Sequence, residues 1–114
     1  MRFLELLFYE PAEVKIFKGV KIKIPSMSAF LIHKLIVFQR RQNKEKSLKD
    51  LKQIVAVAKR IISDVEEKTR LYRLWKTLSD GWKKKVRKGI TIGVKELPIE
   101  EETWSMLTRI LFPA

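Results

Sequence analysis

The stretch KIPSMSAFLIHKLIVFQRR, residues 23–41, decides how the rest of the sequence is interpreted. Pro25 ends the segment before it, and the hydroxyl of Ser26 or Ser28 can accept hydrogen bonds from the free amides of a first helical turn. The apolar residues that follow predict a helix that reaches about Arg41. This helix either belongs to the core, with its polar residues at the edges, or faces a ligand and directs cations at an anion.

The residues before this helix alternate in hydropathy and do not follow a helical period. In VKIFKGVKIKI, residues 14–24, apolar side chains fall on one face and lysines on the other, with Lys18 and Gly19 at the turn. The first residues of the chain also alternate. Residues 1–24 are therefore predicted to form a β-hairpin region.

A second helix is predicted in KSLKDLKQIVAVAKRI, residues 46–61, because its apolar residues recur at i, i+3 and i+4. Ser47 and Asp50 have the spacing of a capping box at its start. Ser63 and Glu66 repeat this signature before a third helix.

Two glycines are expected to interrupt the helices in the rest of the chain. Gly81 is expected to interrupt or kink the third helix, and Gly89 to end the basic run that follows. ITIGV, residues 90–94, is predicted to be extended. A final helix is expected after Pro98 and to end near Phe112, with acidic residues at the positive end of its dipole.

The expected fold class is therefore α+β, with a small N-terminal antiparallel β-sheet or hairpin followed by a bundle of about four helices. A length of 114 residues and a hydrophobic content of 46% suit one modest core. We expect a single domain over residues 1–114, with a hairpin region at 1–24 and a helical region at 26–112.

The composition excludes several kinds of site. The chain has no cysteine and one histidine, which argues against zinc clusters, iron–sulfur centres, thiol nucleophiles and disulfides. Its apolar runs are too short for a membrane span, which requires roughly 20 residues, and its N-terminus does not resemble a signal peptide. We expect a cytoplasmic protein without membrane contact. The 25 Lys and Arg against 13 Asp and Glu give a formal charge of +12, which favours phosphates or acidic partners.

One candidate site lies in the basic stretch from residue 34 to residue 60, which holds nine Lys or Arg and two acids. Arg40 and Arg41 can fork around phosphate oxygens, and the lysines beyond them can follow a phosphate backbone. Such a charge run also fits the solvated face of an amphipathic helix. Asp50 likewise has two interpretations, as the capping carboxylate or as a carboxylate that orients Lys34 or an arginine across the helix pair.

A second candidate is the run WKKKVRKG, in which an aromatic residue precedes five cations. Trp75 falls on an apolar helical stripe and Trp104 lies in the final amphipathic helix, so both are expected in the core. The indole next to the basic run is the one expected to stack on bases. The possible nucleic-acid contacts are Trp82, Lys83, Lys84, Lys85, Arg87 and Lys88.

VKIKIPSMSAFLIHKLIVFQRR, the basic connector and KSLKDLKQIVAVAKRI together resemble the C-terminal, substrate-side half of a nucleotidyltransferase-like family in the polymerase-beta-type superfamily. LWKTLSDGWKKKVRKGI is similar to the trailing helices of that family, so the resemblance covers roughly residues 14–90. It implies that Lys34, Arg41 and Lys49 face the nucleotide phosphates. It also implies that Asp50 holds these basic residues in position.

The sequence departs from this superfamily at the catalytic site. The chemistry there depends on a Gly-Ser turn followed by spaced carboxylates that hold two metal ions. This chain has no such motif, and the acids of its N-terminal strand region, Glu5, Glu10 and Glu13, do not have the required spacing. We therefore expect no transfer by this chain alone, no cofactor in it, and Mg²⁺ only with a catalytic partner. A fragment, a split-gene product and a degenerate relative all fit this expectation.

The function expected from these observations is a nucleotide- or phosphate-binding portion of a nucleotidyltransferase-like protein that lacks its own metal-binding carboxylates. Its partners would be the phosphates of a nucleotide or nucleic acid, and a catalytic half or partner chain. Two alternatives remain. One is a basic nucleic-acid-binding module without catalysis, which would show a steep salt dependence. The other is an interaction protein whose basic surface meets an acidic partner.

Overall fold

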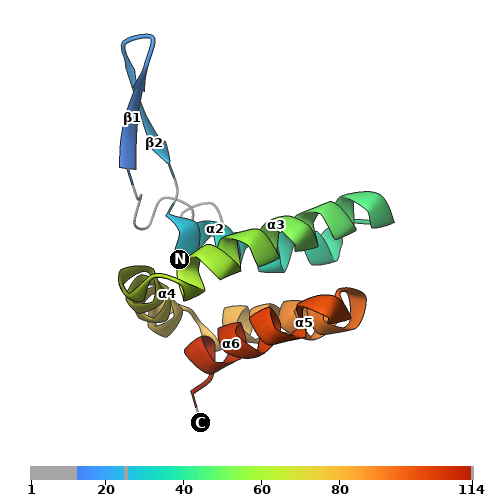
Figure 1. The fold of residues 1–114 in the computed structure, drawn as a ribbon. Coiled ribbons are helices and arrows are strands. Elements are labelled where there is room, and N and C mark those ends of the chain that lie inside the picture. Colours follow the sequence, from blue (N-terminus) through green and yellow to red (C-terminus); the bar gives the residue numbers. More distant parts are fainter. Residues whose placement is uncertain (1–12, 25, 114) are drawn as a thin grey trace.

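The computed structural model describes residues 13–24 and 26–113, and Figure 1 shows a helical body from which a two-stranded ribbon extends. Strand β1, Glu13–Phe17, pairs antiparallel with β2, Val20–Ile24, so that Phe17 lies opposite Val20. Lys18 and Gly19 form the turn with positive φ angles of 50° and 79°. Two such residues are what a two-residue hairpin loop of the twisted, primed type requires.

The helical body consists of five α-helices in the described residues. They are α2 (Met27–Val37), α3 (Lys44–Ile62), α4 (Val65–Thr77), α5 (Asp80–Glu96) and α6 (Glu101–Leu111), with short 3₁₀ helices η1 (Phe38–Arg40) and η2 (Pro98–Glu100). The buried hydrophobic residues of the described chain all lie in these helices or next to their ends. The predicted α+β class with about four helices is therefore wrong, because the core is that of an all-helical bundle.

The additional helix content comes from α5, which continues through the stretch predicted to be extended. Gly89 does not end it, because this residue packs against α2, where a Cβ would collide with the carbonyl of Leu35 and lie 2.9 Å from Nε2 of Gln39. A Cβ on Gly93 would lie 2.6 Å from the indole of Trp104 on α6. Two close approaches of the α5 backbone thus require glycine within a helix, and this packing overrides the local strand preference of ITIGV.

Short polar side chains set the starts of the helices. Ser26 caps α2 by accepting the amide of Ala29 at 3.1 Å, which confirms one of the two predicted caps. Asn43 caps α3, so the capping box predicted to begin at Ser47 is wrong. Asp64, not Ser63, caps α4. Asn43 and Asp64 are the stronger caps because the side chain of each accepts hydrogen bonds from two backbone amides of the first turn.

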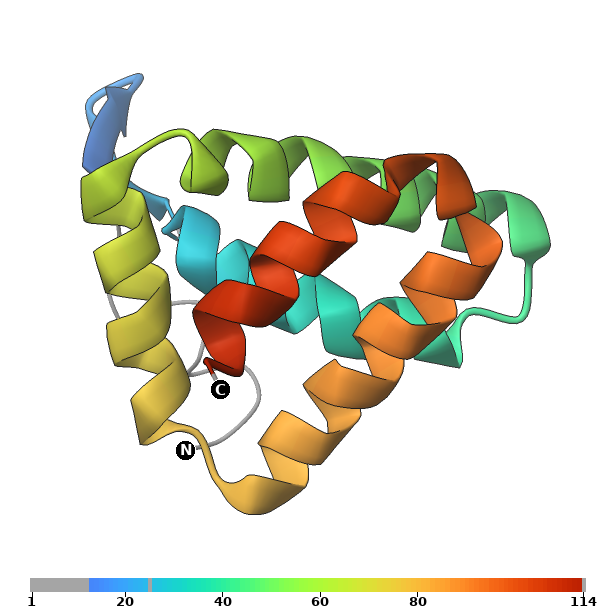
Figure 2. The same ribbon diagram turned by 60° about the horizontal axis from the view of Figure 1, so that its bottom comes forward.

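Helix α2 is central in this arrangement and packs against α3, α4 and α5, while α6 packs against α3, α4 and α5. Figure 2 shows α4 and α5 diverging from their connection, with α6 crossing the space between them. The turn from α2 to α3 lies toward the C-terminal end of α5, and the α4–α5 connection lies at the other end of that helix (Figure 2). No helix among the described residues has the length and apolarity needed to cross a bilayer.

Candidate phosphate-binding site and aromatic pocket

Asp50 joins two cations that come from different segments of the chain. It projects from α3, and its Oδ1 accepts a hydrogen bond from Nζ of Lys34 on α2 at 3.1 Å. Its Oδ2 accepts a hydrogen bond from Nε of Arg41, in the turn between the helices, at 3.0 Å. Asp50 is only 4% exposed. Of its two predicted roles, the capping role is wrong, and the carboxylate instead fixes Lys34 and Arg41. These three residues are called the α2–α3 cluster below.

The charges of the α2–α3 cluster keep Asp50 ionised. Burial acts to raise the pKa of Asp50, but the hydrogen bonds and positive charges of Lys34 and Arg41 outweigh it, so the pKa lies below its ordinary value. The cluster therefore contains one negative and two positive charges at neutral pH. One positive charge is left to attract an anion.

The two cations differ in their access to solvent. The side chain of Lys34 is 20% exposed, and its ammonium lies 5.7 Å from the centroid of the Phe30 ring. The side chain of Arg41 is 39% exposed, and only one nitrogen of its planar fork is engaged by Asp50. Neighbouring His33 is half-buried, and burial followed by the charge of Lys34 lowers its pKa. His33 is thus neutral at physiological pH.

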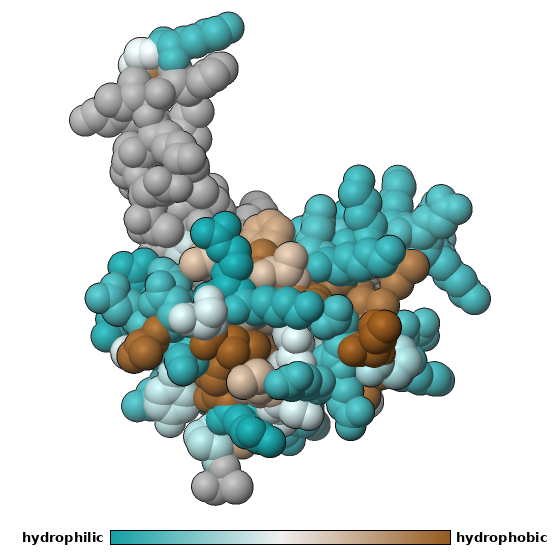
Figure 3. Space-filling model, in the orientation of Figure 1, coloured by the Kyte–Doolittle hydropathy of each residue, from teal (hydrophilic) through white to brown (hydrophobic). Residues whose placement is uncertain are grey.

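More cations surround the cluster at the same end of the molecule. Arg40 lies in η1 and Lys49 precedes Asp50 on α3, and both are exposed. Figure 3 shows hydrophilic side chains gathered over this end of α3. A cavity of about 370 Å³ adjoins Arg41, lined by Arg41, Lys44, Ser47, Leu48, Leu51 and Glu96. Sequence reasoning missed Glu96, whose place beside Arg41 follows only from the packing of α5.

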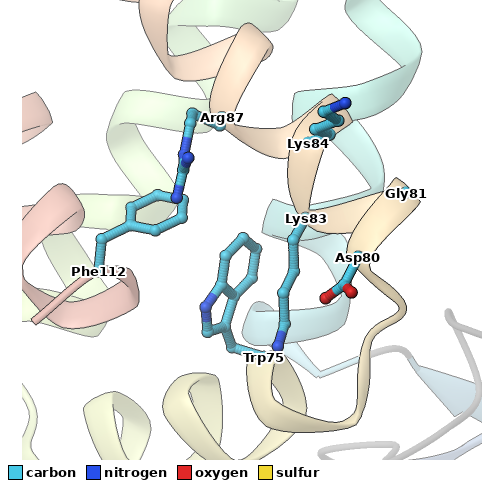
Figure 4. A pocket seen from close by; sticks show the side chains of 7 residues that line it. All are labelled: Trp75, Asp80, Gly81, Lys83, Lys84, Arg87 and Phe112. Atoms are coloured by element: carbon cyan, nitrogen blue, oxygen red, sulfur yellow. The ribbon is translucent and has the colours of Figure 1, made fainter.

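A second hollow, called the aromatic pocket below, lies between α4, α5 and the residue after α6. It has a volume of about 570 Å³ and is shown in Figure 4, with the lining residues Trp75, Asp80, Gly81, Lys83, Lys84, Arg87 and Phe112. The rings of Trp75 and Phe112 meet edge to face, with centroids 5.0 Å apart and planes at 85°. This geometry is favoured by the charge distribution of aromatic rings.

Two cations of the aromatic pocket lie over its rings. Nζ of Lys83 is 5.8 Å from the centroid of Trp75, and Cζ of Arg87 is 4.4 Å from the centroid of Phe112. Figure 4 shows the Arg87 guanidinium directed at the phenyl ring. Cation–π attraction therefore holds both positive charges at the wall of the pocket.

The residues of the basic run predicted to contact nucleic acid lie in different places in the structure. Lys83, Lys84 and Arg87 line the aromatic pocket, whereas Lys85 and Lys88 are exposed outside its lining. Trp82 is partly buried and packs against the hydrophobic core, so its predicted role in base stacking stays a prediction. Trp75 and Trp104 are buried, which confirms their predicted core positions.

Sequence reasoning did not find the two rings of the aromatic pocket. Trp75 belongs to the core stripe of α4 and nevertheless lines the pocket. Phe112 follows α6 and is far from the basic run in sequence. The one available signal was the short connection from α4 to α5, which brings residues 75 and 83 together.

No three His, Cys, Asp or Glu side chains in the part of the chain that the structure describes lie together as metal ligands would. A family model for nucleotidyltransferases matches residues 1–77. The match includes the whole α2–α3 cluster and ends before α5, so it does not reach the cations of the aromatic pocket. No curated protein and no solved structure matches the chain.

Proposed function

The chain belongs to a nucleotidyltransferase family, and from this premise we propose that the α2–α3 cluster binds the phosphates of the nucleotide substrate. The observation that carries the proposal is the buried carboxylate of Asp50, which holds an ammonium and a guanidinium on its two oxygens. Both cations lie within the residues that match the family model.

The hydrogen bonds to Asp50 hold both cations in place for an anionic ligand. Lys34 and Arg41 are oriented before a ligand arrives, so less side-chain freedom is lost when it binds. The guanidinium of Arg41 has five N–H donors in a plane, and the part not engaged by Asp50 suits two oxygens of one phosphate. Exposed Arg40, Lys44 and Lys49 add to the positive field at this end of the molecule.

We propose in addition that this chain does not supply the metal-binding carboxylates of the transfer reaction. The support is the sequence, which has no Gly-Ser turn followed by a pair of aspartates. The attacking and leaving oxygens in this chemistry are stabilised by metal ions. A catalytic partner or another chain segment would then bring the metal, with Mg²⁺ as the expected ion.

An NMR titration of the chain with ATP and Mg²⁺ tests the binding site. We expect saturable amide shifts around Lys34, Arg41 and Lys49. Arg41→Gln should weaken binding about tenfold, because a charge-assisted bond to a phosphate is lost. Arg73→Gln is the matched control, since it removes one positive charge from an exposed position on α4. Equal weakening by both variants would show that ATP responds only to net charge, and would contradict the proposal.

A transfer assay tests the absence of the catalytic carboxylates. The purified chain with ATP, Mg²⁺ and a range of nucleotide and protein acceptors should give no labelled product. Product formed by the unaltered chain and lost in a parallel preparation of Arg41→Gln would belong to this chain and not to a contaminant. That result would overturn the second part of the proposal while supporting the first.

A further inference from the structure

We infer that the aromatic pocket binds a nucleoside phosphate unit, meaning a base with its attached sugar and phosphate, at a site separate from the α2–α3 cluster. The unit has two sources, a free mononucleotide and the end of a nucleic-acid strand. Both present the same base and phosphate to the protein. The experiment below distinguishes them.

The walls of the pocket suit a flat aromatic ligand. Trp75 is only 4% exposed and its ring is thus fixed by the core, and the Phe112 ring stands nearly perpendicular to it with the two centroids 5.0 Å apart. The guanidinium of Arg87 lies over the phenyl ring and is the flat surface on which a base can stack. Bases stack on aromatic rings and on arginine planes with little preference for sequence, because every base has a π-face.

The charges of the pocket suit a phosphate. Lys83, Lys84 and Arg87 bring three positive charges against the single carboxylate of Asp80. The pocket is therefore left with two positive charges, which match a phosphate monoester. Lys83 has three N–H donors and Arg87 has five, so their ring contacts leave donors for phosphate oxygens.

Size and position are consistent with an independent site. The volume of about 570 Å³ lies within the range of small-molecule pockets, roughly 300–1,000 Å³. Lys83 and Glu96, which line the aromatic pocket and the cavity beside Arg41, are 13 positions apart on α5. A helix rises about 1.5 Å per residue, so these two residues lie roughly 20 Å apart along α5, and Arg87 of the aromatic pocket lies roughly 14 Å from Glu96.

This separation is too long for direct transfer between the two sites, because reacting atoms must approach to about 3–3.5 Å. We therefore assign the ligand of the aromatic pocket no part in the transfer step. Its binding does not rest on the proposed function.

The test follows the indole N–H signal of Trp75 during titration of the full chain with AMP. We expect a saturable shift of this signal. Arg87→Gln should weaken AMP binding about tenfold, because a charge-assisted bond is lost. Lys88→Gln is the matched control, since it removes one positive charge at the adjacent exposed position that does not line the pocket. Equal weakening by both variants would show that AMP responds only to the general positive charge of this surface, and would overturn the inference.

Two further titrations, with inorganic phosphate and with a hexanucleotide, test which part of the ligand is recognised and from which source it comes. Inorganic phosphate should bind about 5- to 150-fold more weakly than AMP, since stacking of one base is worth about 1–3 kcal/mol. Equal affinity for phosphate and AMP, with no effect of Phe112→Leu in a chain whose folding is verified by its NMR spectrum, would overturn base recognition. A hexanucleotide that shifts Trp75 when AMP does not would identify the strand end as the source. No shift with either ligand would refute the inference.

The same spectra keep this inference apart from the proposed function. ATP with Mg²⁺ reports on the amides around Lys34 and Arg41, and AMP reports on Trp75. Shifts at the aromatic pocket alone would support this inference while the proposed function fails. Shifts at the α2–α3 cluster alone would do the reverse.

Discussion

Replacement of Asp50 by asparagine is expected to lower the free energy of unfolding by about 2 kcal/mol at pH 7. Asparagine keeps the size of the side chain but removes its charge and one of its two acceptor oxygens. Its amide group would then face either Lys34 or Arg41, and both of these are donors. At least one charge-assisted hydrogen bond of a buried carboxylate is lost.

The magnitude follows from the exposure of the three side chains. Removal of one partner from a fully buried ion pair costs about 3–5 kcal/mol, whereas exposed pairs contribute about 0–1 kcal/mol. Asp50 is 4% exposed, but the side chains of Lys34 and Arg41 are 20% and 39% exposed and regain water when the carboxylate is gone. The expected loss therefore lies between these limits, with most of it on the Lys34 side.

Urea unfolding followed by tryptophan fluorescence measures this loss. With a dependence of roughly 1–3 kcal/mol per molar urea, a loss of about 2 kcal/mol moves the midpoint by about 1 M. The control is Glu45→Gln, which removes an exposed negative charge from the first turn of the same helix. Its effect on the helix dipole is worth about 0.3–1 kcal/mol.

The pH dependence provides an independent check on the same residue. The pKa of Asp50 is lower in the folded chain than its ordinary value of about 3.9, so its contribution is fully present above that value. It is lost as the pH falls through the folded pKa. The difference between the parent chain and Asp50→Asn should therefore shrink below about pH 4. A loss at pH 7 no larger than that of Glu45→Gln, or one independent of pH, would refute the account of the cluster.

Two further predictions concern packing and titration. Gly89→Ala should destabilise the chain by about 1–3 kcal/mol in urea unfolding, because its methyl group would overlap the carbonyl of Leu35 and press on Gln39. Gly81→Ala, with nothing within 4 Å of its Cβ, should stabilise it by about 0.5–1 kcal/mol, and equal effects of the two changes would contradict the α2–α5 contact. The lowered pKa of His33 makes stability decline as pH falls from about 6.5 toward the folded pKa, because the unfolded chain binds the proton more readily. His33→Gln should remove this decline in unfolding experiments between pH 7.5 and 5, from about 1 unit above to about 1.5 units below the ordinary histidine value, and an unchanged profile would contradict the assignment.

Local signals predicted the parts of the fold that depend on neighbours in sequence. Ser26 as the cap of α2 and Trp75 and Trp104 as core residues follow from capping chemistry and helical spacing, and the structure confirms them. Helix α5 could not be predicted in this way. Its β-branched residues 90–92 favour a strand, and only the close contacts of Gly89 and Gly93 with other helices explain its continuation.

The candidate site was predictable only as a pair of alternatives. The spacing of Ser47 and Asp50 satisfies a capping box, and Lys34 is 16 residues from Asp50 in sequence. The choice between the two depends on how α2 and α3 pair, which no local pattern contains. The place of Phe112 in the aromatic pocket was also not predictable from local sequence. Phe112 contacts Trp75 only because α6 packs against α4.

The most direct test of the central claim is the titration of the chain and of Arg41→Gln with ATP and Mg²⁺, followed by amide shifts at two salt concentrations. We predict saturable shifts around Lys34, Arg41 and Lys49 in the parent chain and an affinity about tenfold lower in the variant, with Arg73→Gln unchanged. Shifts spread over all basic segments, lost at high salt and equally weakened by both variants, would contradict a nucleotide phosphate site at the α2–α3 cluster.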